Sequence, residues 1–390
     1  MKPWKMLLIC FVFIFSLTQC SPLQSDDING SDEEGTITVS TTTQKESSML
    51  KEETLSENPD QGILFLRFTN EFGTRSSEVF VLEIPLDQDE YMLRPALSFD
   101  MVFGYQFLSE MVKDENAVAG VNGGFSYAYG RHGGVFIRDK RYYNWKTDQY
   151  PVLVFKDHRY FFMESKDFNG FVQLKDRSIK IHGLNKPHEY TSNVIVYNPL
   201  YGKTTRVQEE HFSITVQDNV IKKAGKVLNE QEIPSDGYVI TVGKPYDEAK
   251  LLPVYIPGDA VALRFDPVME QEDWAFECGD RLVKDGENVA PDHSGWVGTL
   301  EGYDPRTAVG INSKGNPVLM VVDGRQPGYS YGVTAKELAD ILIEMDIKDA
   351  AMLDGGASSE MYFEGDVVNK PSYKGEERPM ASAFVVVKKD

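Results

Sequence analysis

Short apolar runs closed by turn-forming residues most constrain the fold of this chain. From Gly62 onward these runs are rich in β-branched and aromatic residues, a composition typical of strands. No run beyond the first twenty residues approaches the roughly 18 apolar residues of a membrane-spanning helix. We expect strands at 63–68, 79–84, 117–121, 152–155, 171–174, 194–197, 238–242 and 261–265.

The last hundred residues change period. Val318–Val322 reads as a central strand, and Ala350–Leu353 and Ala383–Val387 as two further buried strands. Between the first two, Thr334 and Glu337 form a capping box, and apolar residues at i, i+3, i+4 and i+7 predict a helix. A second helix is predicted within 96–113, where Leu97, Met101, Leu108, Met111 and Val112 have roughly helical spacing.

These patterns predict an α+β fold. We expect a mixed β-sheet core with flanking helices, strand-rich N-terminal and middle parts, and a strand-helix-strand C-terminal part. A length of 390 residues fits one large domain or two ordinary ones. Apolar residues make up 41% of the chain, which is enough for a sizeable core and excludes global disorder.

The N-terminus predicts export and lipidation. Residues 1–19 read as a signal peptide, with two early lysines and the apolar run Met6–Phe15. Leu17-Thr18-Gln19-Cys20 resembles a bacterial lipobox, in which Cys20 would carry lipid; the alternative is an ordinary signal peptide with a chance cysteine. We therefore expect a lipid-anchored protein of the bacterial cell envelope, either periplasmic or surface-exposed, that meets the membrane only through this lipid.

Residues 20–60 are predicted to be a lipidated cysteine followed by a disordered acidic tether, with the folded domain at 61–390. Acidic clusters at 25–27 and 32–34 resemble surface-export signals of some lipoproteins, or they belong to a solvated linker. The formal net charge of −20 disfavours nucleic acid as a partner. After loss of Cys10 with the signal peptide and lipidation of Cys20, Cys278 stands alone, and we expect a small buried side chain there.

Polar residues stand directly beside four of the predicted strands, next to glycine or proline. Glycine lets a backbone approach a ligand, and arginine matches phosphate with a planar fork of donors. Sites in strand-helix-strand arrangements gather at the carboxyl ends of strands. The four segments are Asn122-Gly123-Gly124-Phe125, Asp304-Pro305-Arg306-Thr307, Asp323-Gly324-Arg325 and Asp354-Gly355-Gly356-Ala357-Ser358-Ser359.

Together with Ala308-Val309-Gly310, the Thr334–Ala339 helix start, Val368-Asn369 and Glu377-Arg378-Pro379, these segments occur in an order that resembles the phosphodiester glycosidase domain family. The resemblance is densest at 304–387, and weaker echoes extend it over nearly all of 62–390. Three positions depart from the family pattern: Ser126 in place of a second aromatic residue, Cys278-Gly279-Asp280 in place of Gly-Gly-Pro, and Ala357 in place of a third glycine. Ser126 and Ala357 bear on substrate identity more than on the fold.

The resemblance implies hydrolysis of a sugar-1-phosphodiester, like that of N-acetylglucosamine, to free sugar and a phosphomonoester. A carboxylate, Asp323 or Asp354, would act as nucleophile or activate water, and Arg306 or Arg325 would stabilise the leaving phosphate. The predicted catalytic residues are Asp323, Asp354 and Arg306. The predicted substrate-binding residues are Asn122, Gly123, Gly124, Thr307, Arg325, Gly355, Gly356, Ser358 and Ser359.

Several alternatives stay open. Arg306 could be a structural residue tied to Asp304, and Asp323 and Asp354 could cap turns or hold Ca²⁺ or Mg²⁺. Neither Ser358 nor Ser359 begins a GxSxG elbow, the histidines show no HExxH spacing, and of the histidines only His132 lies near a polar segment. The competing functions are a hydrolase of other envelope phosphodiesters or amino-sugar polymers, and a carbohydrate-binding lipoprotein without catalysis.

Overall fold

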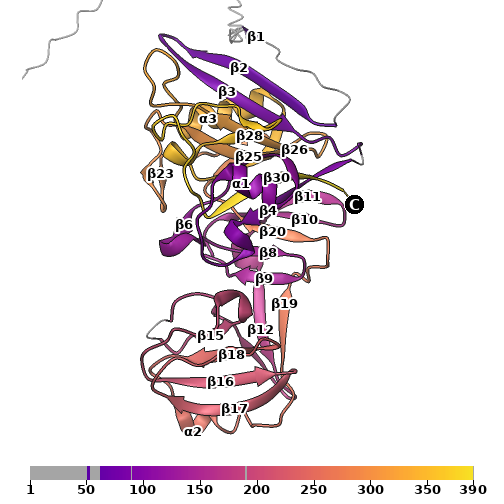
Figure 1. The fold of residues 1–390 in the computed structure, drawn as a ribbon, viewed down its shortest axis with the longest axis vertical. Helices are drawn as coiled ribbons and strands as arrows, with labels where there is room; N and C mark the ends of the chain where they lie inside the picture. The colour runs from indigo at the N-terminus through magenta and orange to yellow at the C-terminus, as the bar shows by residue number, and fades with distance from the viewer. Residues whose placement is uncertain (1–50, 53–61, 89, 189–190, 390) are drawn as a thin grey trace, which may run out of the picture. The chain divides into compact units, whose positions relative to one another are not determined.

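The computed structural model describes residues 51–52, 62–88, 90–188 and 191–389 (Figure 1). The predicted signal peptide, Cys20 and most of the predicted tether lie outside the described residues. Within the described ranges, each helix is too short or too polar to cross a membrane. Cys278 is buried and unpaired, as expected, and burial raises the pKa of its thiol to about 12.

Strands dominate the structure (Figure 1). The largest sheet has the order β1 (Lys51–Glu52), β2 (Leu64–Phe72), β3 (Arg75–Glu83), β26 (Pro317–Val322), β25 (Arg306–Asn312), β27 (Ile347–Met352), β21 (Arg281–Lys284), β22 (Glu287–Asn288). A second sheet has the order β29 (Asp366–Val367), β28 (Met361–Phe363), β5 (Ala117–Asn122), β30 (Ser382–Lys388), β4 (Tyr91–Leu97). A third has the order β11 (Arg159–Glu164), β10 (Pro151–Lys156), β20 (Trp274–Glu277), β8 (Phe136–Arg138), β9 (Arg141–Asn144).

The middle of the chain adds a three-stranded sheet and a further five-stranded sheet. One is β13 (Ser178–Lys180), β12 (Asn169–Gln173), β19 (Ala262–Asp266), and the other is β14 (Gly183–Leu184), β15 (Val194–Tyr197), β18 (Gly237–Val242), β16 (His211–Gln217), β17 (Val220–Val227). Asn185 joins this part to β9 by donating from Nδ2 to the Tyr143 carbonyl at 3.0 Å. Short hairpins complete the set: β6 (Ser126–Tyr127) with β7 (Arg131–His132), and β23 (His293–Ser294) with β24 (Gly298–Thr299).

Side-chain alternation along the strands builds the core between sheets. In β3, Phe80 and Leu82 face the largest core cluster, whereas Val79 and Val81 face the opposite side of the sheet. The alternation repeats in β30, where Phe384 and Val386 enter the central cluster and their neighbours lie against α1 (Leu108–Asp114). The period of two places apolar side chains on both faces, so the sheets pack face to face.

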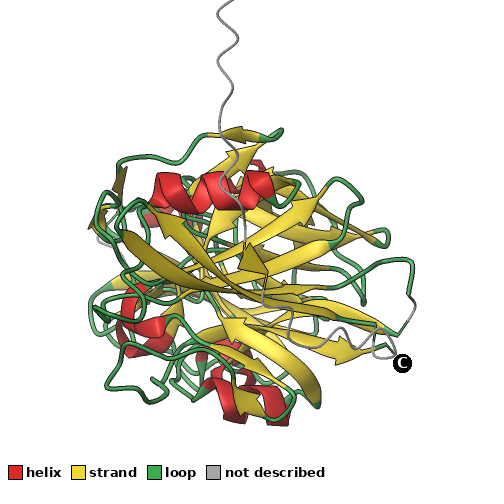
Figure 2. Ribbon diagram, turned by 90° about the horizontal axis from the view of Figure 1, so that it is seen from above, coloured by secondary structure: helices red, strands yellow, loops and turns green. Residues whose placement is uncertain are grey.

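The expected α+β fold with a helix-flanked mixed sheet is wrong. Strands account for 46% of the structure and helices for 11%, so the fold is predominantly β. In the described part the α-helices are α1, α2 (Glu248–Leu251) and α3 (Ala335–Glu344), and Figure 2 shows strands filling the interior with helices at the periphery. Pairings there are antiparallel except for the two-residue β14–β15 contact. The central core is formed between sheets, and α1 and α3 each cover only part of an outer sheet face.

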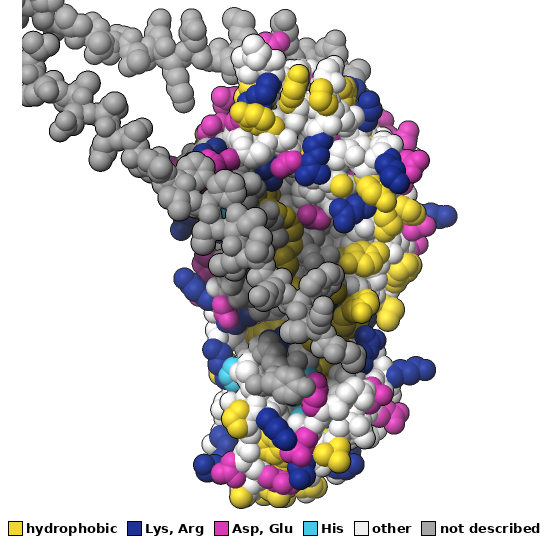
Figure 3. Space-filling model, turned by 90° about the vertical axis from the view of Figure 1, so that its left-hand side faces the viewer, with side chains coloured by type: hydrophobic (Ala, Val, Ile, Leu, Met, Phe, Trp, Pro, Cys, Tyr) yellow, Lys and Arg dark blue, Asp and Glu magenta, His cyan; other side chains and the backbone are white. Residues whose placement is uncertain are grey.

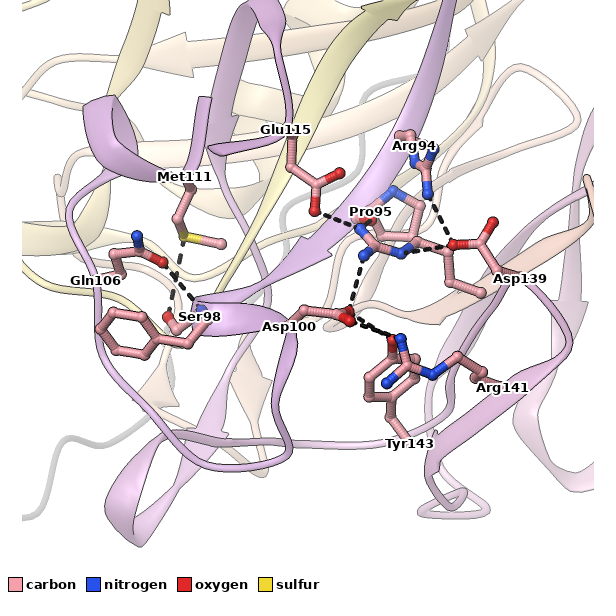
Figure 4. Close-up of polar contacts among 12 residues, drawn as sticks. Arg94, Pro95, Ser98, Asp100, Gln106, Met111, Glu115, Asp139, Arg141 and Tyr143 are labelled. Carbon is pink, nitrogen blue, oxygen red and sulfur yellow. Dashed lines mark hydrogen bonds and ion pairs between the residues drawn. The ribbon is translucent and has the colours of Figure 1, made fainter. Parts of the chain in front are cut away.

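The second predicted helix is mostly strand and loop. Leu97 ends β4, and α1 begins only at Leu108. Between them Phe99 and Asp100 have φ values of 57° and 50°, which a helix cannot accommodate. Figure 4 shows Asp100 beside Arg141 and Tyr143; its carboxylate also accepts a 2.8 Å bond from Arg138. These distant partners stabilise a turn that helical spacing alone did not predict.

Candidate active site

The four polar segments meet where strand ends of the eight-stranded sheet lie beside the end of β5 in the second sheet. Strand β25 lies between β26 and β27 and is antiparallel to both, so its first residue, Arg306, pairs with Val322 at the end of β26. Ala308 pairs with Met352 at the end of β27. Asn122 at the end of β5 completes the edge through a bond to the Asp354 carbonyl. The expected clustering at strand ends is therefore observed.

Asn122 joins its own segment to two other converging segments, those of Thr307 and Asp354. Its Nδ2 donates to the Asp354 carbonyl at 2.6 Å, and its Oδ1 accepts from Thr307 Oγ1 at 2.7 Å and from the Glu360 N–H at 3.2 Å. Both Asn122 and Thr307 are buried. Because their polar atoms are engaged inside the protein, the geometry favours a positioning role over the substrate contact predicted for them.

Close approach of another backbone explains Gly123, and a positive φ explains Gly356. A Cβ on Gly123 would stand 2.6 Å from the Ser382 backbone, while Gly123 itself donates to Ser382 O and accepts from Asp354 N. Gly356 has φ +63°, and a Cβ there would stand 3.1 Å from the guanidinium nitrogens of Arg325. Their backbone N–H groups are already used, since Gly356 donates to Pro305 O. These glycines bring the segments together without offering free donors.

Asp354 is the carboxylate best placed for chemistry. It is half-buried just beyond β27, and its Oδ1 accepts from the Gly355 N–H at 3.0 Å. Burial raises the pKa of Asp354, opposed by a hydrogen bond from Ser358 and by the charge of Arg378. Arg378 is exposed and donates from Nη1 to Ser358 Oγ at 3.3 Å. A carboxylate, a hydroxyl and a guanidinium therefore share this edge.

Asp323 is placed differently. It is 1% exposed, and its carboxylate accepts from Asn369 Nδ2 at 2.8 Å, Lys370 N–H at 2.8 Å and Tyr329 Oη at 2.9 Å. Burial raises its pKa. With both oxygens engaged, Asp323 has the geometry of the turn-capping alternative rather than that of a nucleophile. Among the described residues, no three His, Cys, Asp or Glu side chains converge as a metal site would require.

The two predicted phosphate ligands differ in exposure. Arg306 is 4% exposed and donates to the carbonyls of Val333, Leu300 and Gly302, with Asp304 Oδ2 3.6 Å from its Nη2. Arg325 has a side chain that is 51% exposed, and its Nε donates to Asp304 Oδ1 at 2.8 Å. Arg306 thus has the surroundings of a structural brace, and Arg325 is the arginine open to a substrate.

Glu360 and Arg378 were not among the predicted site residues. Glu360 is fully buried, its Oε1 accepts from the Arg378 N–H at 2.6 Å, and its Oε2 has no partner among the described residues. Burial raises its pKa to about 8. The Glu377-Arg378-Pro379 triplet was the sequence signal for Arg378, whereas a glutamate after two serines gives none.

Three other predicted positions face inward. Ser358 bonds Arg378, whereas Ser359 is 1% exposed and its hydroxyl has no partner within the described ranges. Gly124 packs against His132 and Phe276. His132 is buried, and burial lowers its pKa to about 3, so the imidazole stays neutral.

Sequence comparison finds relatives over part of the chain. A stretch of 112 residues is 33% identical to the SPbeta prophage-derived uncharacterized protein YomE of Bacillus subtilis, covering 29% of this chain and 17% of that protein. A stretch of 103 residues is 39% identical to the N-acetylglucosamine-1-phosphodiester alpha-N-acetylglucosaminidase of Bos taurus, covering 25% of this chain and 19% of that protein. Each match thus spans less than a fifth of its relative's length.

Two solved structures share the fold. A hypothetical protein from Synechocystis superposes with a TM-score of 0.72 at 18% identity, covering 84% of this chain and 62% of that one. A protein from Burkholderia pseudomallei K96243 superposes with a TM-score of 0.65 at 22% identity, covering 80% of this chain and 74% of that one. Residues 210–387 match the profile of the phosphodiester glycosidase family, and this stretch includes Arg306, Asp323, Arg325 and Asp354. By this match, residues 210–387 belong to the phosphodiester glycosidase family.

Proposed function

We propose that this protein hydrolyses a sugar-1-phosphodiester, such as one of N-acetylglucosamine, to the free sugar and a phosphomonoester. The family match of residues 210–387 supports the reaction class. The observation that carries the proposal is the position of Asp354, half-buried at a strand end beside two exposed arginines. The charge of Arg378 favours the ionised form of Asp354, and the Arg325 guanidinium lies against Gly356, which follows Asp354 by two residues.

The reaction breaks the bond between the anomeric carbon and the phosphate oxygen. The electron pair of that bond leaves with the phosphate, and positive charge develops on the sugar ring. Asp354 either attacks the anomeric carbon or takes the proton of a water that does. The guanidinium groups of Arg325 and Arg378 stabilise the second negative charge that forms on the departing phosphate. At a preorganised site such stabilisation lowers the barrier by roughly several kcal/mol.

Direct assay of a panel of sugar-1-phosphodiesters, with separate detection of free sugar and of inorganic phosphate, tests this proposal. Asp354→Asn should keep the fold and lose at least about 10²-fold in turnover, the usual scale for a positioned acid or base. Asp366→Asn is a matched control, because exposed Asp366 also accepts the N–H of the next residue, at 2.8 Å. A folded Asp354→Asn variant with near-normal turnover would leave Asp354 as a turn cap.

The location proposed for this activity is the bacterial cell envelope, with the protein anchored through lipid on Cys20 and residues 61–390 forming the catalytic domain. The lipobox pattern supports the anchor, and the acidic tether would separate the domain from the membrane. The substrate would then be a glycan or another sugar phosphodiester of that compartment.

A further inference from the structure

One cavity is lined by described residues that all lie outside the candidate active site. A cavity of about 520 Å³ opens beside the β6–β7 hairpin, a size typical of small-molecule sites. Its described lining contains no Asp or Glu, although the chain carries a net charge of −20. The basic and large aromatic residues that line it include Arg131, Lys146, Lys186, Tyr127, Tyr150 and Trp296.

Arg131 is a buried cation without a counter-charge. It is 9% exposed, and burial lowers its pKa, yet no carboxylate pairs with it in the described part of the chain. Its Nη1 donates to Asn144 Oδ1 at 3.0 Å, and its Cζ lies 4.3 Å from the centre of the Tyr127 ring. Because an arginine stays charged in proteins, an anion in the cavity would supply the missing partner.

The neighbouring acidic groups do not neutralise Arg131. Asp148 pairs with Lys146 at 2.7 Å and has a side chain that is 61% exposed. Glu277 lies outside the lining and accepts bonds from the Val135 N–H at 2.9 Å and from Thr147. Burial raises the pKa of Glu277 to about 7, which reduces its negative charge near neutral pH.

The cavity wall suits a sugar ring. The rings of Trp296 and Phe125 stack at 5.4 Å with an interplanar angle of 7°, and Tyr127 and Tyr150 lie 5.0 and 6.0 Å from Trp296. Such amphipathic aromatic side chains combine an apolar face with a polar tip.

The wall is also close to the proposed catalytic carboxylate. Phe125 follows Gly123 by two residues, a span of at most about 7 Å, and Gly123 O accepts the Asp354 N–H at 3.0 Å.

The segment that precedes Arg131 is held in place by the loop that carries Gly104. Gly104 donates to Tyr129 O at 3.0 Å, and Gly130 packs directly on the Gly104 backbone. The loop that carries Gly104 starts at Asp100, whose polar contacts are drawn in Figure 4. On the face shown in Figure 3, basic and acidic side chains are interspersed, in contrast to the described part of the cavity lining, which contains basic residues and no acidic one.

We propose that this cavity binds a sugar unit that carries an oxyanion, either a carboxylate or a phosphate monoester, next to the bond that is cleaved. The inference rests on the proposed function and narrows its substrates to acidic glycans. Arg131 holds the oxyanion through its free guanidinium N–H groups, and the Trp296 wall holds the ring.

The test is a fluorescence titration of the full chain with glucuronate, glucose 6-phosphate and glucose. Trp145 and Trp296 both line the cavity and report its occupation. We expect saturable changes with the two anions and at least about tenfold weaker binding of glucose. The ratio between the two anions tells a carboxylate site from a phosphate site. Equal responses to all three sugars, or no response to any, would overturn the inference without any variant.

Variants separate this site from the candidate active site. Arg131→Gln should weaken both anions at least about tenfold, while Arg325→Gln and Asp354→Asn should leave their binding unchanged. Arg264→Gln is the matched control, because Arg264 also lies over an aromatic ring, Phe171 at 4.8 Å, but outside the cavity. Loss of binding in Arg325→Gln but not in Arg131→Gln would place the anion at the candidate active site and overturn the inference. The proposed hydrolysis would survive that result. A failure of the proposed catalytic role would instead appear as near-normal turnover of Asp354→Asn.

Discussion

Asn122→Ala removes the side chain that joins the segments of the candidate site. Three partners lose their bonds to this side chain: the Asp354 carbonyl, the Thr307 hydroxyl and the Glu360 N–H. A fourth bond, from Asn122 Nδ2 to the Gly123 carbonyl at 3.2 Å, is also lost, but that carbonyl still accepts the Asp354 N–H. Each bond contributes about 1 to 1.5 kcal/mol net, and stranded buried groups push each value toward the upper end. We therefore expect the free energy of unfolding to fall by about 3 to 5 kcal/mol, a large part of the roughly 5 to 15 kcal/mol typical of a domain.

Guanidinium chloride unfolding, followed by tryptophan fluorescence and by circular dichroism, measures this loss. Asn169→Ala is the control, because its Nδ2 only donates to Asp167 O two residues away, and we expect a change within about 0.5 kcal/mol. Thr307→Val removes a single bond and should cost about 1 kcal/mol. Since Thr307 and Asn122 are partners, the double variant should lose less than the two single losses added together. A loss below about 1 kcal/mol for Asn122→Ala would refute Asn122 as the joining residue.

Three further predictions address charge and anchoring. Arg325→Lys should lower kcat/KM on a sugar-1-phosphodiester far more than on a neutral aryl glycoside, because only the phosphodiester needs the two-pronged guanidinium. Arg306→Lys should instead affect both substrates equally and lower the melting temperature. The opposite pattern in the paired assays would make Arg306 the phosphate ligand and Arg325 the structural residue. In the folded wild type the buried Glu360 carboxyl keeps its proton up to about pH 8, whereas in the unfolded chain it loses the proton near pH 4.5, so the wild type loses stability as the pH rises from 5 to 8. Relative to the wild type, the stability of Glu360→Gln should therefore be at least about 1 kcal/mol higher at pH 8 than at pH 5. Urea unfolding at both pH values that shows no such difference would contradict the burial of Glu360 as the cause. Cys20→Ala should abolish lipid labelling and partitioning into the detergent phase, and unchanged partitioning would exclude Cys20 as the anchor.

Local patterns in the sequence were enough to predict many elements and the convergence of the site. The α3 capping box is present, with Glu337 N–H donating to Thr334 Oγ1 at 3.1 Å, because capping depends on residues three apart. The polar segments meet because antiparallel neighbours place the start of β25 beside the ends of β26 and β27.

Features that depend on distant partners were not predictable from the same patterns. Leu97 fits a helical period, yet it ends β4, and the turn after it is held by Arg138 and Tyr143, about forty positions away in the chain. Arg306 and Arg325 both follow the family pattern, but only tertiary packing buries one and exposes the other. The roles of Glu360 and Arg378 depend likewise on contacts that no spacing rule describes.

In the proposed reaction the bond between the sugar and the phosphate oxygen breaks, with Asp354 as the acting carboxylate. Hydrolysis of a sugar-1-phosphodiester in H₂¹⁸O, followed by mass spectrometry of both products, distinguishes this cleavage from attack at phosphorus. We expect one ¹⁸O in the released sugar at its anomeric position, none in the phosphomonoester, and loss of this labelling with Asp354→Asn. Incorporation of ¹⁸O into the phosphomonoester would show attack at phosphorus and would contradict the glycosidase mechanism.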